Sequence, residues 1–138
     1  MDMDRNTAFA VLLDIEKSEA FSNLALNRRI AENQPQNQAF VRELVYGVLK
    51  YKLLLDYQLD RLVKTGVRKL KKQDLTLLRM GMYQLIFMDS VPEYAAVSET
   101  VQMAKKYARG RERFINAVLR SFIRSGRKLQ LPDRAQDT

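Results

Sequence analysis

The stretch "KQDLTLLRMGMYQLIFM", residues 72–88, decides the fold class of this chain. Drawn as a helix at about 100° per residue, it places apolar side chains on nearly every side. A helix that is apolar all round belongs in the middle of a bundle, because neighbouring helices must cover each of its faces. The following "DSVP", residues 89–92, ends the helix. Residues 72–88 therefore predict the central helix of a helical bundle.

The sequence on both sides of this helix is also helical, and strand alternation is missing. Three helices are predicted before it, at residues 5–19, 22–32 and 37–63. Ser22 is expected to cap the second, and Gly66 to end the third, which is predicted to be continuous. The basic linker "VRKLKK", residues 67–72, follows. Two helices are predicted after the central one, at residues 94–108 and 111–125. Gly126 is expected to close the last helix, and the whole is an all-α bundle of about six to seven helices.

The residue types that are absent exclude several classes of chemistry. The 138 residues, 46% of them hydrophobic, suffice for one folded domain. They include no cysteine and no histidine, which excludes disulfides, cysteine nucleophiles, ordinary zinc sites and histidine acid–base catalysis. Neither a Gly-rich phosphate loop nor a carboxylate pair at a catalytic spacing is present. We therefore expect no catalytic residue, no metal site and no cofactor in this chain.

The N-terminal sequence is also informative about location. It carries acids where a signal peptide carries bases. No apolar run approaches the roughly 18 residues that a membrane span needs. We expect a cytoplasmic protein without a membrane partner.

The net charge of +8 is confined to one segment. Residues 105–128 contain nine bases and one acid, Glu112, so the remainder of the chain is neutral. Charge gathered in one segment favours a nucleic-acid partner over a merely solvated surface. The candidate RNA-binding residues are these nine bases together with one amide: Lys105, Lys106, Arg109, Arg111, Arg113, Asn116, Arg120, Arg124, Arg127 and Lys128.

Asn116 stands in the middle of this segment, within "RERFINAVLRSFIRSGRK", residues 111–128. On a helical wheel it shares a face with Arg113, Arg120 and Arg124, opposite the apolar residues. Guanidinium groups bind phosphates through paired hydrogen bonds, and an amide can read a base edge or a ribose hydroxyl. The alternative is that Asn116 hydrogen-bonds a neighbouring loop inside the fold. The sequence leaves both roles open.

Arg79 is a charged residue within the apolar surface of the central helix. A charge buried there must be paired, and Glu99 and Glu43 are the candidate acids. We predict a structural ion pair, Arg79 with Glu99 first among the two, that fixes the register of the helices. Gly47 and Gly81 lie inside helices, where glycine costs about 1 kcal/mol relative to alanine. They are predicted to allow the close approach of two backbones.

Several stretches, taken in order, resemble a known family. "FVRELVYGVLKYKLLLDYQLD", "LLRMGMYQLIFMDSVPEYAAVSETVQMAKKY" and "RFINAVLR" resemble the NusB-like domain. They resemble more closely its version at the N-terminus of the RsmB/Sun (Fmu) 16S rRNA cytosine-C5 methyltransferases, which "FSNLALN" also fits. The resemblance covers residues 4–131. The residues that match the family pattern are Arg42, Gly47, Arg79, Gly81, Glu99, Asn116 and Arg120.

This resemblance implies an RNA-binding, non-catalytic N-terminal domain that helps to position 16S rRNA. In the methyltransferases a following domain binds S-adenosylmethionine and uses cysteine, so the resemblance implies that cofactor for the parent protein only. Residues 1–129 would form the NusB-like domain, and residues 130–138 a polar tail or the start of a linker. One alternative is a free-standing NusB-type transcription antitermination factor, which binds RNA and a ribosomal protein. Another is an interaction module that docks its own catalytic domain and hardly touches RNA.

Overall fold

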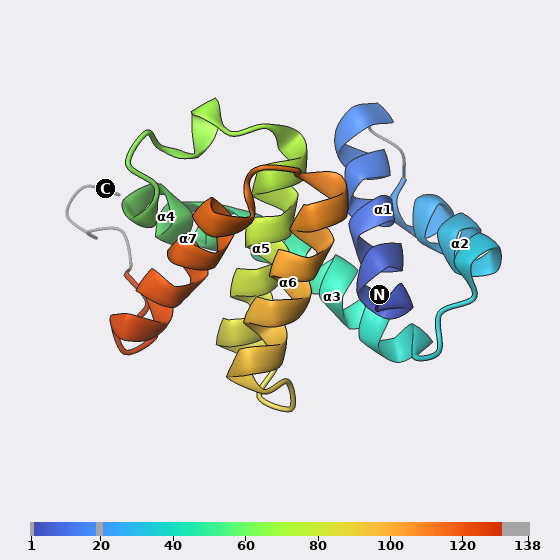
Figure 1. Ribbon diagram of the computed structural model, residues 1–138. Coiled ribbons are helices and arrows are strands. Elements are labelled where there is room, and N and C mark those ends of the chain that lie inside the picture. The colour runs from blue at the N-terminus through green and yellow to red at the C-terminus, as the bar shows by residue number, and fades with distance from the viewer. Residues whose placement is uncertain (1, 19–20, 131–138) are drawn as a thin grey trace, which may run out of the picture.

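The computed structural model describes residues 2–18 and 21–130. Within these ranges the chain forms α-helices, one short 3-10 helix and no strand, so the predicted all-α class is confirmed. The elements are α1 (Met3–Ser18), α2 (Ser22–Asn33), α3 (Gln38–Lys50), α4 (Lys52–Leu62), η1 (Val67–Lys69), α5 (Lys72–Phe87), α6 (Glu93–Tyr107) and α7 (Glu112–Arg124). In Figure 1, α5 lies near the middle, with α1 and α2 toward one side and α4 and α7 toward the other.

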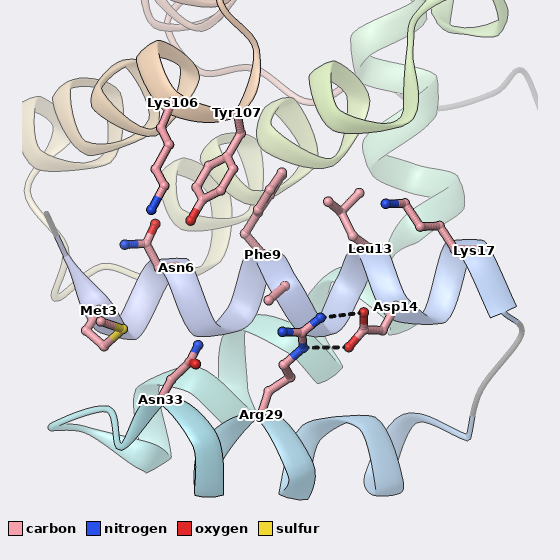
Figure 2. Close-up of a pocket in the computed structure, with 11 residues that line it drawn as sticks. Met3, Asn6, Phe9, Leu13, Asp14, Lys17, Arg29, Asn33, Lys106 and Tyr107 are labelled. Carbon is pink, nitrogen blue, oxygen red and sulfur yellow. Dashed lines mark hydrogen bonds and ion pairs between the residues drawn. The ribbon is translucent and has the colours of Figure 1, made fainter.

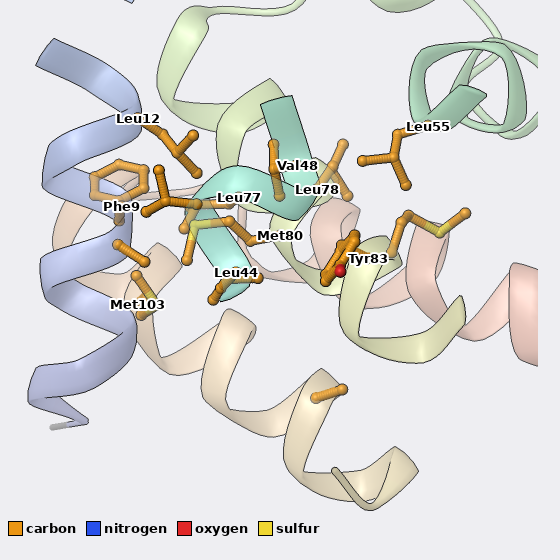
Figure 3. Close-up of a cluster of buried hydrophobic side chains, with 14 of the residues drawn as sticks. Phe9, Leu12, Leu44, Val48, Leu55, Leu77, Leu78, Met80, Tyr83 and Met103 are labelled. Carbon is orange, nitrogen blue, oxygen red and sulfur yellow. The ribbon is translucent and has the colours of Figure 1, made fainter. Parts of the chain in front are cut away.

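The α5 helix is the centre of the bundle, as residues 72–88 predict. It packs against α1, α3, α4, α6 and α7. Figure 3 shows its Leu77, Leu78, Met80 and Tyr83 meeting side chains of α1 and α3. Burying an apolar side chain of this size contributes about 1.5–3 kcal/mol to stability. The apolar surface on every side of α5 is therefore used, which is why the rest of the chain wraps around it.

The predicted single helix over residues 37–63 is wrong, because it divides at Tyr51. The backbone of Tyr51 departs from helical geometry, with φ −103° and ψ 18°. Its ring stacks on Phe87 of α5, with centroids 4.3 Å apart. The division lets α3 pack against α1 and α5, and lets α4 turn toward α5 and α7. The apolar residues of this stretch recur at helical spacing throughout, but they belong to two helices that pack against different neighbours.

The predicted helix ends are partly correct. Ser22 is the first residue of α2 rather than its cap, and Phe21 occupies the cap position without a side-chain hydrogen bond. The α4 helix ends at Leu62, four residues before Gly66. Gly126 closes α7 as expected. It adopts a φ of 83°, and the next amide, of residue 127, bonds back to the carbonyl of Phe122.

The two helical glycines are contacted by side chains rather than by a second backbone. A Cβ on Gly47 would overlap the ring of Tyr83. A Cβ on Gly81 would lie 3.0 Å from the Leu119 methyl groups and 3.2 Å from Thr100 Oγ1. The prediction that two backbones approach closely at these glycines is therefore wrong, because the groups that occupy the space are side chains.

The last described residue is tied to the bundle. The buried side chain of Gln58 on α4 donates to the carbonyl of Gln130 at 2.6 Å. Its Oε1 accepts from the amide of Gln130 at 2.8 Å. The predicted tail begins with this residue, and the rest of it, residues 131–138, lies outside the described residues. These two hydrogen bonds hold the backbone of Gln130 against α4.

Candidate nucleic-acid interface

The two faces of α7 are arranged as the helical wheel predicts. Its apolar residues are buried in the bundle: Ile115, Val118, Leu119 and Phe122. Arg113, Arg120 and Arg124 are exposed on the opposite face. The apolar residues recur every three or four positions, so one face enters the core and the basic face is left outside.

Asn116 is half-buried and bonds along its own helix. Its Oδ1 accepts a hydrogen bond from Arg120 Nε at 3.2 Å. Among the described residues, the side chain of Asn116 hydrogen-bonds Arg120 and not a neighbouring loop. The bond couples Asn116 to the guanidinium that follows it by one turn. Its predicted contact with a base remains a prediction.

The other predicted residues fall in three places. Lys105 and Lys106 end α6, and Arg109 and Arg111 belong to the connection into α7. Arg127 and Lys128 follow α7, and all six are exposed. The structure therefore spreads the ten residues along α7 and around both of its ends.

Two of these bases already have acidic partners. Arg111 Nε donates to the buried carboxylate of Asp74 at 3.1 Å, and its guanidinium lies 4.2 Å from the ring centre of Phe114. Arg127 Nη1 lies 3.3 Å from Glu93 Oε2. Both contacts place the side chain of a base against the bundle.

Arg79 is buried as predicted, but its partners are not those expected. Its guanidinium donates to both carboxylate oxygens of Asp56 on α4, at 2.7 and 2.8 Å. Its Nη1 also lies 3.2 Å from Glu16 on α1. The predicted pair with Glu99 is therefore corrected, as is the alternative with Glu43. Glu99 is partly exposed and Glu43 is exposed, whereas the side chain of Arg79 extends between α1 and α4.

A second group of bases was missed as part of the site. A cavity of about 390 Å³, here called the loop groove, lies between the segment that leads into α5 and the connection from α6 to α7. Its lining residues are Lys69, Lys71, Gln73, Asp74, Tyr107, Ala108, Arg109 and Arg111. The basic run "VRKLKK" is the sequence signal for this groove. It is predicted only as a linker, and the sequence does not show that it lies beside residues 107–111.

Another cavity, of about 380 Å³, lies between α1, α2 and α6. Figure 2 shows Arg29 paired with Asp14 in its wall, while Lys106 and Tyr107 reach it from α6. The two hydrogen bonds of the pair measure 2.7 and 2.8 Å. The hydrogen bond from Arg29 lowers the pKa of Asp14, although partial burial opposes this. Its lining has three cations, Lys17, Arg29 and Lys106, against Asp14. The loop groove has four cations against Asp74, so this cavity is the less basic of the two.

Other kinds of site find no support in the part of the chain that the structure describes. Over residues 2–18 and 21–130, no group of three acidic, histidine or cysteine side chains could hold a metal ion. In the same ranges no helix is both long and apolar enough to cross a membrane. Among the described residues, the exposed basic side chains are therefore the candidate site.

The model of the NusB family matches residues 3–124. The chain belongs to the NusB family. It is 38% identical over 125 residues to the probable ribosomal RNA small subunit methyltransferase B of Bacillus subtilis, covering 88% of this chain and 28% of that protein. It is 34% identical over 122 residues to the transcription antitermination protein NusB of Levilactobacillus brevis, covering 83% of this chain and 86% of that protein.

Solved NusB structures share the fold of this chain. The antitermination factors NusB and NusE in complex with dsRNA give a TM-score of 0.81 at 22% identity, covering 90% of this chain and 96% of that one. NusB of T. maritima gives a TM-score of 0.79 at 21% identity, with 88% of each chain covered. The predicted NusB-like bundle is therefore confirmed. The chain spans about 28% of the length of the methyltransferase relatives that it matches.

Proposed function

We propose that this chain is an RNA-binding domain, without catalysis of its own, that positions 16S rRNA for a methyltransferase domain using S-adenosylmethionine. The observation that carries the proposal is the exposed basic face of α7, opposite the residues that it buries in the core. Bases on a rigid helix attract a polyanion and hold it in one orientation. The match to methyltransferase B of Bacillus subtilis supports the rRNA and the methyltransferase context.

A free-standing antitermination factor is the second candidate. It is supported by the match to NusB of Levilactobacillus brevis, of which this chain covers 86%. The two candidates differ in the protein that each would bind. A partner such as NusE, which accompanies NusB in the solved complex with dsRNA, would join the antitermination factor. A methyltransferase domain would join the rRNA-positioning domain. Pull-down of each purified partner with this chain separates them.

The test of RNA binding is a titration of a fluorescently labelled 16S rRNA fragment by anisotropy over a series of salt concentrations. For single-stranded RNA, the slope of log K against log salt should be about −0.7 per phosphate neutralised. Arg120→Glu together with Arg124→Glu should weaken binding to all RNAs alike. The fold should survive, because both side chains are exposed.

Two results would overturn the proposal. One is a wild-type chain that binds no RNA, or binds it without salt dependence. The other is a double reversal that leaves RNA affinity intact but abolishes docking of a separately made methyltransferase domain, since the basic face of α7 would then be a protein interface. Calorimetry with S-adenosylmethionine checks the cofactor: this chain alone should show no tight binding, because its sequence has no nucleotide cradle. It should also not methylate RNA, because it has no cysteine nucleophile.

A further inference from the structure

A second basic segment lies at the same end of the bundle as the start of α7. Residues 64–72 contain five bases and no acid, namely Lys64, Arg68, Lys69, Lys71 and Lys72. All five are exposed. In Figure 1 the connection from α4 to α5 and the connection from α6 to α7 both lie at the upper end of the bundle. Two basic segments that are more than thirty residues apart in the sequence are thus brought to one end.

The loop groove is where these two segments meet. Lys69 and Lys71 line it from one segment, and Arg109 and Arg111 from the other. Its acid, Asp74, is 5% exposed at the side chain and is bonded to Arg111. Four cations against one buried carboxylate leave the groove with a net charge of +3. A cleft lined by charges of one sign concentrates the electric field more than a convex surface does.

Arg111 is held in place before any ligand arrives. Asp74 accepts from its Nε at 3.1 Å, and the ring of Phe114 supports its guanidinium at 4.2 Å. The side chain is still 44% exposed. A guanidinium fixed in this way loses less conformational entropy on binding an anion than a free surface arginine does.

We propose that the loop groove binds phosphates of the RNA backbone, and that it contributes more to RNA affinity than Arg120 and Arg124 do. This inference rests on the proposed RNA-binding function. Arg120 and Arg124 stand on the convex face of α7, where they bond Asn116 and Ser121 of their own helix. Lys69 and Lys71 are exposed, and no ion pair of theirs occurs among the described residues. A cavity of about 390 Å³ has room for a phosphodiester with its ribose.

The experiment compares two double reversals that change the net charge equally. Lys69→Glu with Lys71→Glu alters the groove, and Arg120→Glu with Arg124→Glu alters α7. Each is titrated with the same labelled single-stranded RNA over a salt series. The groove reversal should weaken binding roughly tenfold or more, and the salt slope should become shallower by about 1.4, which corresponds to two lost phosphates. The α7 reversal should weaken binding less.

The matched control is Lys69→Arg with Lys71→Arg, which keeps both charges and should bind RNA within about twofold of the wild type. Circular dichroism must give the same thermal midpoint for every variant, since all the altered side chains are exposed. Inorganic phosphate serves as a separate probe, followed by the amide resonances of residues 71–74 and 108–111. It should bind there far more weakly than the RNA.

The inference is wrong if the groove reversal leaves RNA affinity within twofold while the α7 reversal lowers it. It is also wrong if the groove reversal abolishes binding of an acidic peptide and not of RNA, or if inorganic phosphate binds as tightly as RNA. A wild-type chain that binds no RNA would overturn the proposed function together with this inference. Wild-type RNA binding with an unaffected groove variant would overturn this inference alone.

Discussion

The guanidinium of Arg79 on α5 donates one hydrogen bond to each carboxylate oxygen of Asp56 on α4, at 2.7 and 2.8 Å. Glu16 on α1 adds a third contact at 3.2 Å and is itself bonded by Lys52 at 2.7 Å. These four side chains connect the central helix to α1 and to the start of α4. Arg79 is 9% exposed at its side chain, whereas Asp56 is 23% exposed. The positive charge is therefore more deeply buried than its partner.

This asymmetry predicts unequal effects of removing either member. Asp56→Ala leaves the buried guanidinium with only Glu16 and should lower the free energy of unfolding by about 3 kcal/mol. Arg79→Met replaces the cation by a shorter unbranched apolar chain, and the two partly exposed acids can be hydrated. It should cost about 1 kcal/mol. Urea unfolding of the two variants beside the wild type measures both. An Arg79→Met variant that is the less stable of the two would contradict the asymmetry.

Acid sensitivity should arise in part from Glu16. The hydrogen bond from Lys52 lowers the pKa of Glu16, ahead of the opposing effect of burial. A carboxylate whose pKa is lower in the folded state stabilises the fold at high pH. That contribution is complete above the ordinary value of 4.5 and is lost as the pH falls through the folded pKa.

The measurement is the free energy of unfolding of the wild type and of Glu16→Gln, at neutral pH and at several pH values below 4.5. The glutamine cannot titrate, so the stability advantage of the wild type should shrink as the pH falls. An advantage that stays constant over this range would show that the ionisation of Glu16 does not contribute.

The sequence predicts the elements of this fold better than the partners of its polar residues. Residues 72–88 are apolar all round, and that local property is enough to place α5 at the centre. The faces of α7 likewise follow from helical periodicity alone. The partner of Arg79 does not, because the division at Tyr51 sets the direction of α4 and brings Asp56 to α5. A stripe of apolar residues has the same spacing in one long helix and in two shorter ones.

The sequence does not predict the loop groove, because the groove also depends on how the helices are arranged in space. Its bases lie in two connections, at residues 69–71 and 109–111. Each connection is recognisably basic in the sequence, but their meeting depends on where α5 begins and where α6 ends in space. Periodicity describes the faces of one helix and says nothing about which connections share an end of the bundle.

Gly47→Ala should destabilise the fold, although alanine favours helices in general. Alanine in an exposed helix interior gains about 1 kcal/mol over glycine. At Gly47 the added Cβ would overlap the ring of Tyr83, which is 6% exposed and packed also against Phe87. Overpacking of this kind costs about 1–3 kcal/mol. Thermal or urea unfolding should show the loss.

A double variant tests the cause of that loss. Tyr83→Leu removes the ring atoms that the new Cβ would meet, so Gly47→Ala should cost less in the Tyr83→Leu background than in the wild type. Equal costs in both backgrounds would mean that the ring is not the obstacle.

Asn116→Ala should change the preference of this chain between RNAs more than its overall affinity. Phosphate contacts position a nucleic acid without specifying its sequence, whereas an amide that reaches a base edge discriminates between bases. Asn116 Oδ1 is bonded to Arg120 Nε at 3.2 Å, so the amide and the guanidinium present one joined surface. Losing one good base contact reduces discrimination by about 1–3 kcal/mol. Anisotropy titrations with two RNAs that differ at a single base measure this ratio.

Asn116→Asp separates base contact from the support of Arg120. An aspartate still accepts from Arg120 Nε, but it has no amide donor and it repels phosphates. It should therefore weaken both RNAs together as well as lower their ratio. If instead Asn116→Ala leaves the ratio unchanged and lowers the thermal midpoint, while Asn116→Asp restores that midpoint, then Asn116 acts only to hold Arg120. The basic face of α7 would in that case position RNA without reading it.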